Sequence, residues 1–130
     1  MLIEGRRLLV ERRKLAKRLA PGTLAIPGGH VEAGEDLDRT LARESNEELG
    51  IEPRDVAYIC TLVHQAEELR KLHYFAVRSW EGRIVAEEAE SVLWVSLDHR
   101  EQLDFDVDRT AITEYLRLER EGGLVWRTRA

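Results

Sequence analysis

Three glutamates in the middle of the chain have a spacing that brings their side chains to one face of a helix. Glu44, Glu47 and Glu48 occupy positions i, i+3 and i+4 of a segment with helical pattern, where Cβ atoms lie about 5–6 Å apart. Carboxylates this close repel one another, and protonation of one of them or a hard cation relieves the repulsion. Ligands that offer only oxygen suit Mg²⁺ or Mn²⁺. Taken alone, such glutamates more often form a solvated helix face.

A turn with little side-chain bulk precedes these glutamates. In the sequence Pro27-Gly28-Gly29 the backbone can approach a phosphate or offer a carbonyl group to a metal ion. His30 follows directly, where it either contacts a phosphate or simply fills the turn. The turn and the acidic face together favour a metal-dependent phosphate site more strongly than either does alone.

The joint pattern resembles the signature of the Nudix hydrolase family, G-x5-E-x7-R-E-U-x-E-E-x-G-U, in which U is a bulky apolar residue. The matching residues span positions 29–51 and are Gly29, Glu35, Arg43, Glu44, Glu47, Glu48, Gly50 and Ile51. One position departs from the signature, because Ser45 stands where the first bulky residue belongs. Ser45 lies on the apolar stripe of the helix, so we expect weaker packing or a hydroxyl bonded to a carbonyl one turn back.

The resemblance implies hydrolysis of a nucleoside diphosphate linked to another moiety, by attack of water at phosphorus. Metal ions would neutralise the diphosphate charge and lower the pKa of bound water. By the same resemblance Arg43 would orient the glutamates and Glu35 would support it. The implied catalytic residues are Glu44, Arg43, Glu47 and Glu35, and the implied ligands of Mg²⁺, or of Mn²⁺, are Glu44, Glu47, Glu48 and the carbonyl group of Gly28.

A further metal ligand is implied outside the signature. The segment at residues 80–97 resembles the matching stretch of the nucleoside triphosphate and 8-oxo-dGTP pyrophosphatase group of the family, which places this glutamate at Glu88. Glu87 and Glu90 are near alternatives, and each of the three could equally be a solvated loop residue. A basic run of Lys14, Lys17 and Arg18 precedes the signature, and it either attracts phosphates or forms a solvated loop.

The substrate is less sharply indicated than the reaction. Nudix subfamilies that act on ADP-ribose or diadenosine polyphosphates carry a Pro or Tyr downstream, where this chain has Ala66, Glu67 and Glu68. The remaining resemblance implies a (deoxy)nucleoside triphosphate or a modified nucleotide, cleaved to the monophosphate and pyrophosphate. In that group an Asn or Asp near the C-terminal end of the domain reads the base. The corresponding residue here is Asp106 or Asp108, although Asp108 also suits a helix cap.

Four residues are therefore predicted to bind substrate: Gly29, His30, Arg18 and Asp106. Two other functions remain open. One is hydrolysis of ADP-ribose or another nucleoside diphosphate sugar. The other is a Nudix-like module that senses a nucleotide without cleaving it, which the complete set of signature glutamates disfavours.

Strands alternate with two helices in the sequence pattern. We expect strands at residues 6–12, 23–26, 56–63, 72–80, 83–86 and 92–97, and helices at residues 36–49 and 109–121. Asp36 can cap the first helix and Gly50 can end it in a left-handed turn. The expected fold is α/β, an α/β/α sandwich with a mixed β-sheet between helices, as the resemblance also implies, with residues 1–130 forming one Nudix domain.

Composition excludes several classes of protein. Of 130 residues, 43% are hydrophobic and 35% are charged, and no apolar run approaches the about 18 residues of a membrane span. The net charge of −5 argues against binding to a nucleic-acid polymer. Charged residues from Glu4 onward interrupt any signal peptide, and the single Cys60 cannot form an internal disulfide. We therefore expect a cytoplasmic protein that acts on a small nucleotide.

The chain has only Met1, Leu2 and Ile3 before the turn at Glu4-Gly5. Three residues cover roughly 10 Å, about half of a typical strand. A neighbouring strand then keeps unpaired backbone groups, and such an edge favours pairing with another chain. We therefore expect a homodimer that involves a sheet edge or the face near the N-terminus. The alternative is a monomer whose edge is satisfied by a loop or by water.

Overall fold

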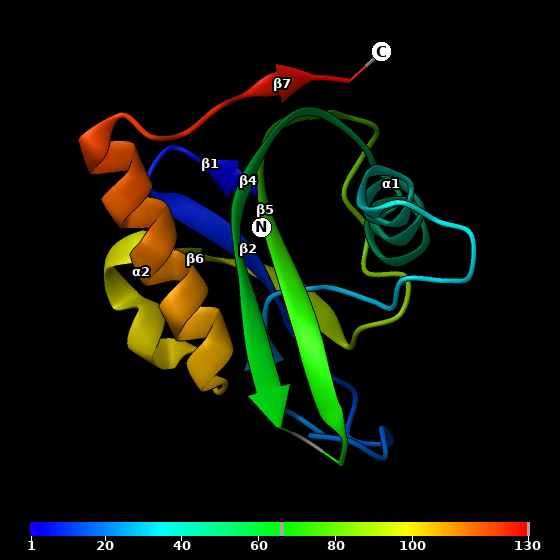
Figure 1. Ribbon diagram of the computed structural model, residues 1–130. Helices are drawn as coiled ribbons and strands as arrows, with labels where there is room; N and C mark the ends of the chain where they lie inside the picture. The colour runs from blue at the N-terminus through cyan, green and yellow to red at the C-terminus, as the bar shows by residue number, and fades with distance from the viewer. Residues whose placement is uncertain (66, 130) are drawn as a thin grey trace.

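The computed structural model describes residues 1–65 and 67–129, and in it two helices lie on opposite sides of a long β-hairpin (Figure 1). The expected α/β/α sandwich is therefore confirmed. In chain order the elements are β1 (Ile3–Glu4), β2 (Arg7–Arg12), β3 (Leu24–Ala25), α1 (Leu37–Leu49), β4 (Glu52–Gln65), β5 (Leu69–Glu81), β6 (Ser91–Ser96), the 3₁₀ helix η1 (Leu97–Gln102), α2 (Asp106–Glu121) and β7 (Arg127–Thr128).

The predicted mixed sheet takes the form of two antiparallel sheets joined by one parallel bridge. In the first sheet β2 pairs with β1 and β3 on one side and with β6 on the other. In the second sheet β4 lies between β5 and β7. The parallel bridge joins Leu2 to Val77, and the N–H of Val77 donates to the carbonyl of Met1 at 2.8 Å. The N-terminal residues thus join the two sheets.

Strand β2 is buried on both faces because it separates two apolar cores. Side chains alternate along a strand, so Leu8 and Val10 pack into the core that contains α2 residues such as Ile112. Leu9 faces the other way and packs with Leu49 at the end of α1. The consecutive apolar run in β2 therefore serves two layers of the sandwich, and it fixes α1 against the sheet.

Both ends of α1 follow the predicted local signals. The carboxylate of Asp36 accepts a hydrogen bond from the N–H of Arg39 at 2.8 Å. Gly50 adopts φ +69°, and its N–H donates to the carbonyl of Asn46 at 2.9 Å. Ser45 is buried, in agreement with its position on the apolar stripe. These caps set the length of the helix and the direction of its acidic face.

Several predicted elements differ from the structure. Strands β4 and β5 extend beyond the predicted ranges 56–63 and 72–80 at both ends. The expected strand at residues 83–86 is wrong, because the N–H groups of Val85 and Glu87 donate to carbonyls of Leu49 and Glu48 at the end of α1. Helix α2 begins at Asp106 rather than at residue 109, with Phe105 as its N-cap residue. The apolar pattern could not indicate this acidic first turn.

The C-terminal segment ties α1 to the second sheet. Strand β7 pairs with β4, where Thr128 lies opposite Asp55. The guanidinium of Arg129 binds both carboxylate oxygens of Asp38 at 2.9 and 3.2 Å, and it donates to the carbonyl of Pro53 at 3.1 Å. Within the described part of the chain, no helix combines the length and the apolar character that a membrane crossing requires.

Candidate active site

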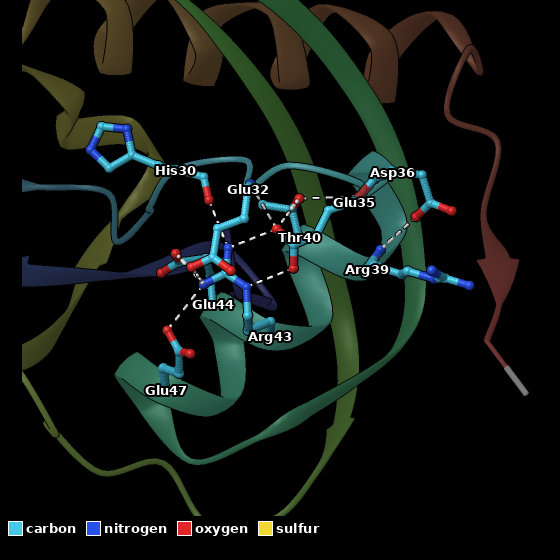
Figure 2. A network of polar contacts seen from close by, with 9 residues as sticks. All are labelled: His30, Glu32, Glu35, Asp36, Arg39, Thr40, Arg43, Glu44 and Glu47. Atoms are coloured by element: carbon cyan, nitrogen blue, oxygen red, sulfur yellow. Dashed lines mark hydrogen bonds and ion pairs between the residues drawn. The ribbon is translucent and has the colours of Figure 1, made fainter.

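Arg43 is the centre of a polar network on α1 (Figure 2). Its guanidinium donates to Glu35 at 2.6 and 2.9 Å, to Glu44 at 2.8 Å and to Glu47 at 3.1 Å. Its Nη2 atom, one of the two nitrogens that donate to Glu35, also donates to the carbonyl of His30 at 2.7 Å. One fixed cation therefore holds two carboxylates of the acidic face and the turn that precedes the helix. This arrangement is compatible with the positioning role that the resemblance implies for Arg43, and that role stays a prediction.

Glu35 fixes Arg43 from the opposite side. Its carboxylate accepts from Arg43, from the N–H of Glu32 at 2.9 Å and from the hydroxyl of Thr40 at 3.1 Å. These donors stabilise the ionised form, and the hydrogen bond from Arg43 contributes most to lowering the pKa of Glu35 from its ordinary value of 4.5 to about 2. Glu35 is thus a permanent anion at neutral pH, as a residue that orients Arg43 must be.

Replacing Glu35 with glutamine is expected to lower the melting temperature at neutral pH and to reduce activity by about 10-fold or more, because Arg43 loses its main partner. The lowered pKa means that the ionised Glu35 adds stability above pH 4.5, which is lost as the pH falls through about 2. The melting temperatures of the wild type and the variant, measured between neutral pH and pH 2, should therefore become equal at the acidic end. A gap in melting temperature that stays constant with pH would contradict this account.

Glu48 stands in the most acidic part of the site. Burial raises its pKa to about 8, and the negative charges of Glu11, Glu44 and Glu88 add to the effect. In the metal-free protein, its carboxyl group therefore retains a proton at neutral pH. Glu48 lines both the main cleft and a small side pocket of about 30 Å³. A buried carboxyl group with three acidic neighbours is an arrangement that a cation would stabilise.

Glu11 is the acidic residue that sequence reasoning missed. It lies in β2, is only 8% exposed, and lines both the main cleft and the side pocket together with Glu48. Burial raises its pKa, whereas the nearby charges of Arg13 and Lys17 lower it. In the sequence it is one more charged residue near the end of a strand. Its burial depends on β3 and β6 flanking β2, which no local pattern reveals.

The predicted outside ligand, Glu88, is exposed and lines the same side pocket as Glu11 and Glu48. Lys14 and Lys17 also line it, so part of the predicted basic run lies beside the acidic groups. The position of Glu88 is compatible with a role as a metal ligand, and that role stays a prediction.

The turn before α1 approaches the acidic face very closely. A Cβ atom on Gly29 would lie 2.0 Å from the carboxylate of Glu44, whereas a Cβ atom on Gly28 would meet nothing within 4 Å. Glu44 is only 16% exposed on its side chain, while Glu47 is 49% exposed and does not line the main cleft. The absence of a side chain at Gly29 is therefore what allows Glu44 to lie against the turn.

The donor set fits a hard divalent cation. Glu11, Glu44 and Glu48 offer only oxygen, and their mutual repulsion is relieved by positive charge. Among residues 1–65 and 67–129, no three acidic, histidine or cysteine side chains are already arranged to hold a metal ion. Arg43 binds one carboxylate oxygen of Glu44 and one of Glu47, so each carboxylate has a second oxygen that could act as a ligand.

The acidic face opens into a cleft of about 950 Å³. Asp108, which is only 6% exposed, lies on another wall of this cleft. Its carboxylate accepts from the N–H of Ile26 at 3.0 Å and from the hydroxyl of Tyr74 at 2.8 Å. Burial raises the pKa of Asp108. His64 also lines the cleft and contacts Phe105 edge to face, so aromatic and polar groups lie together on this wall.

The predicted substrate-binding residues separate into two groups. Gly29 and His30 line the cleft. Arg18 and Asp106 are exposed and do not line it. Arg18 pairs with Glu67 at 2.6 Å, and Asp106 pairs with Arg109. The structure brings Asp108, rather than Asp106, to the cleft. Ala66, one of the three positions considered for substrate class, lies outside the described residues.

Comparison with known proteins identifies the architecture. A family model described as "NUDIX domain" matches residues 1–116. The chain is similar to MutT NUDIX hydrolase from Burkholderia pseudomallei, whose crystal structure superposes with a TM-score of 0.77 at 25% identity. That match covers 87% of this chain and 91% of the other.

Two curated relatives have named substrates. The CTP pyrophosphohydrolase of Escherichia coli (strain K12) is 33% identical over 96 residues, which is 72% of this chain and 68% of that protein. An 8-oxo-dGTP diphosphatase of Buchnera aphidicola subsp. Schizaphis graminum (strain Sg) is 30% identical over 80 residues. This second match covers 62% of this chain and 61% of the relative, so less than two thirds of that relative is spanned.

Proposed function

Since the chain belongs to the Nudix hydrolase family, which acts on pyrophosphate bonds of nucleotides, we propose that it hydrolyses a (deoxy)nucleoside triphosphate or a modified form of one. The products would be the nucleoside monophosphate and pyrophosphate, formed by attack of water at phosphorus. We further propose Mg²⁺ as the cofactor, with Mn²⁺ as a substitute. The alternatives are hydrolysis of ADP-ribose or another nucleoside diphosphate sugar, and binding of a nucleotide without cleavage.

The observation that carries the proposal is one cleft with two unlike walls. Glu44 and Glu48 line one wall, where a divalent cation and a phosphate chain would lie. Asp108 and Tyr74 line another, where a paired carboxylate and hydroxyl can recognise the edge of a base. The cleft of about 950 Å³ is large enough for a nucleotide. Retention of the acidic wall favours hydrolysis over binding without cleavage.

The residues of the acidic wall have two kinds of task in this proposal, which are to bind the cation and to position the groups that bind it. The groups that would hold the cation are five carboxylates and one backbone carbonyl, namely those of Glu44, Glu47, Glu48, Glu11 and Glu88 and that of Gly28. A bound divalent cation would supply neutralisation of phosphate charge and a lowered pKa for the attacking water. Arg43 holds Glu44 in place through its hydrogen bond, and Glu35 holds Arg43. Gly29 leaves room for the carboxylate of Glu44 beside the turn.

The test is a hydrolysis panel with the purified chain. Canonical and oxidised nucleoside triphosphates, ADP-ribose and a nucleoside diphosphate sugar are each incubated with Mg²⁺, with Mn²⁺ or with excess EDTA. We expect monophosphate and pyrophosphate from at least one triphosphate, and no reaction in EDTA. Preferential cleavage of ADP-ribose would favour the alternative substrate class. Tight binding of a nucleotide with no turnover in either metal would favour the sensing module.

Asp108 and Asp106 give a matched pair for the base-reading residue. We expect Asp108→Asn to lower kcat/KM by about 10-fold for the best triphosphate and to change the preference among bases, because the amide replaces one acceptor by a donor. Asp106→Asn should leave base preference as in the wild type, because Asp106 lies outside the cleft. Kinetics on four triphosphates with each variant decide the point. A base preference that changes only in Asp106→Asn would mean that Asp106, and not Asp108, reads the base.

The compartment and the oligomeric state also remain proposals. We propose that the chain acts in the cytoplasm on free nucleotides rather than on a nucleic-acid polymer. We also propose a homodimer, in which a sheet edge or the face near β1 takes part. Light scattering at micromolar concentration tests the dimer, and a mass equal to one chain would refute it.

A further inference from the structure

Arg70 on β5 has unused hydrogen-bonding capacity inside the cleft. Its side chain lines the cleft, and its Nε atom is buried without a hydrogen-bond partner among the described residues. Two weak contacts involve the other nitrogens. Nη1 donates to Nε2 of His30 at 3.3 Å, and Nη2 lies 3.5 Å from a carboxylate oxygen of Glu68. Neither contact satisfies Nε.

A buried donor without a partner is costly, and a guanidinium stays charged under all ordinary conditions. Glu68 does not offset this cost well. Its side chain is 74% exposed, and an exposed ion pair at 3.5 Å contributes little. Arg70 therefore presents a positive charge to the cleft, and its buried Nε has unused donor capacity. Such a group is suited to an anion with several acceptor oxygens.

The position of Arg70 links it to the acidic face. His30 contacts Arg70 through its ring and accepts from Arg43 through its carbonyl. Figure 2 shows the imidazole of His30 directed away from Arg43, while its carbonyl faces the guanidinium. A single residue of the turn thus separates Arg70 from the network that holds Glu44. An anion bound by Arg70 would lie within the same cleft as the acidic wall.

We propose that Arg70 binds a phosphate group of the nucleotide, with its planar N–H fork facing the phosphate oxygens and His30 supporting it. The proposal rests on the proposed function only in taking the phosphate to belong to a nucleotide. Arginine suits this task because its fork matches phosphate geometry in a bidentate manner. The phosphate would give Nε its missing acceptor. Arg70 would then be a binding residue, which acts on substrate and product alike.

The test compares ligands that differ only in the phosphate. The nucleoside monophosphate product and its uncharged nucleoside are each titrated by calorimetry in magnesium buffer, with the wild type, Arg70→Gln, Arg70→Lys and Arg120→Gln. We expect Arg70→Gln to weaken binding of the monophosphate by about 10- to 100-fold and to leave binding of the nucleoside unchanged. The affinity of Arg70→Lys for the monophosphate should lie between those of the wild type and Arg70→Gln, because lysine keeps the positive charge but lacks the planar N–H fork.

Arg120→Gln is the matched control, because Arg120 is exposed on α2 and does not line the cleft. Thermal melts verify that each variant is folded. Equal weakening of nucleoside and monophosphate by Arg70→Gln would overturn the proposal in favour of a contact to the base or the sugar. Unchanged binding of the monophosphate would overturn it outright.

Kinetics separate this proposal from the proposed function. Where the wild type hydrolyses a triphosphate, Arg70→Gln should raise KM by the same factor and leave kcat nearly unchanged, because the contact is made equally in the ground state and the transition state. A fall in kcat without a rise in KM would overturn the role as a binding residue. If the wild type cleaves no nucleotide, the proposed function fails, and the same titrations with inorganic phosphate still decide whether Arg70 binds phosphate.

Discussion

Replacing Glu48 with glutamine is expected to reduce kcat/KM by about 100-fold or more while making the metal-free protein more stable. Activity falls because the variant loses a carboxylate that would hold the cation. Stability rises at pH values above 4.5, because burial and then the negative charges of Glu11, Glu44 and Glu88 disfavour the ionised carboxylate that the unfolded chain carries there. In EDTA we expect a melting temperature about 3–5 °C higher, which corresponds to about 1 kcal/mol in a domain of this size.

These opposite effects distinguish a functional carboxylate from a structural one. Hydrolysis rates and thermal melts in EDTA, on wild type and variant, supply both quantities. Glu121→Gln is the matched control, because Glu121 is exposed at the far end of α2 and pairs only with Arg117 among the described contacts. Loss of activity together with a lower melting temperature would mean that Glu48 supports the fold instead. Retained activity would remove Glu48 from the site.

Adding one methyl group at Gly29 is expected to reduce activity by about 100-fold without unfolding the protein. The new Cβ atom would lie 2.0 Å from the Glu44 carboxylate, which no pair of atoms tolerates. Since this carboxylate is the end of a flexible side chain, it can swing away. It would then lose its hydrogen bond to Arg43 and its place on the cleft wall.

Gly28→Ala is the comparison that isolates this effect, because its added methyl group meets no atom within 4 Å. Steady-state kinetics with circular dichroism on both variants should show a loss at Gly29→Ala at least about tenfold greater than at Gly28→Ala. Equal losses would mean that general stiffening of the turn matters, rather than contact with Glu44. A Gly29→Ala protein with wild-type kinetics would contradict the role of Glu44.

Features encoded within one short segment were predictable from the sequence. The cap at Asp36, the left-handed end at Gly50 and the shared face of Glu44 and Glu47 all follow from helix periodicity and local backbone preference. The resemblance to the family signature added a role for Arg43, whose hydrogen bonds to Glu44 and Glu47 are compatible with it. These signals lie within one helix and its two ends, so the rest of the chain could not alter them.

Features that depend on distant segments were not predictable. Glu11 becomes buried only because β3 and β6 flank β2, and its sequence neighbours do not reveal this. The segment at residues 83–86 has a strand-like pattern, yet its N–H groups find acceptors at the end of α1. Asp108 lies at the cleft where Tyr74 on β5 and Ile26, the residue after β3, supply its hydrogen-bond donors. In each case a tertiary contact outweighed local preference.

The contact between Arg129 and α1 has a consequence for the dynamics of the acidic helix. Arg129 holds Asp38 in the first turn of α1 and is itself anchored to the backbone of β4 through Pro53 and Arg54. Opening of β7 would therefore free the first helical turn as well. Amide protons in these two segments should exchange with solvent as one cooperative unit. The contacts of Arg129 thus couple β7 to the first turn of α1, so we expect the rigidity of the helix that carries the glutamates to depend on the pairing of β7 with β4.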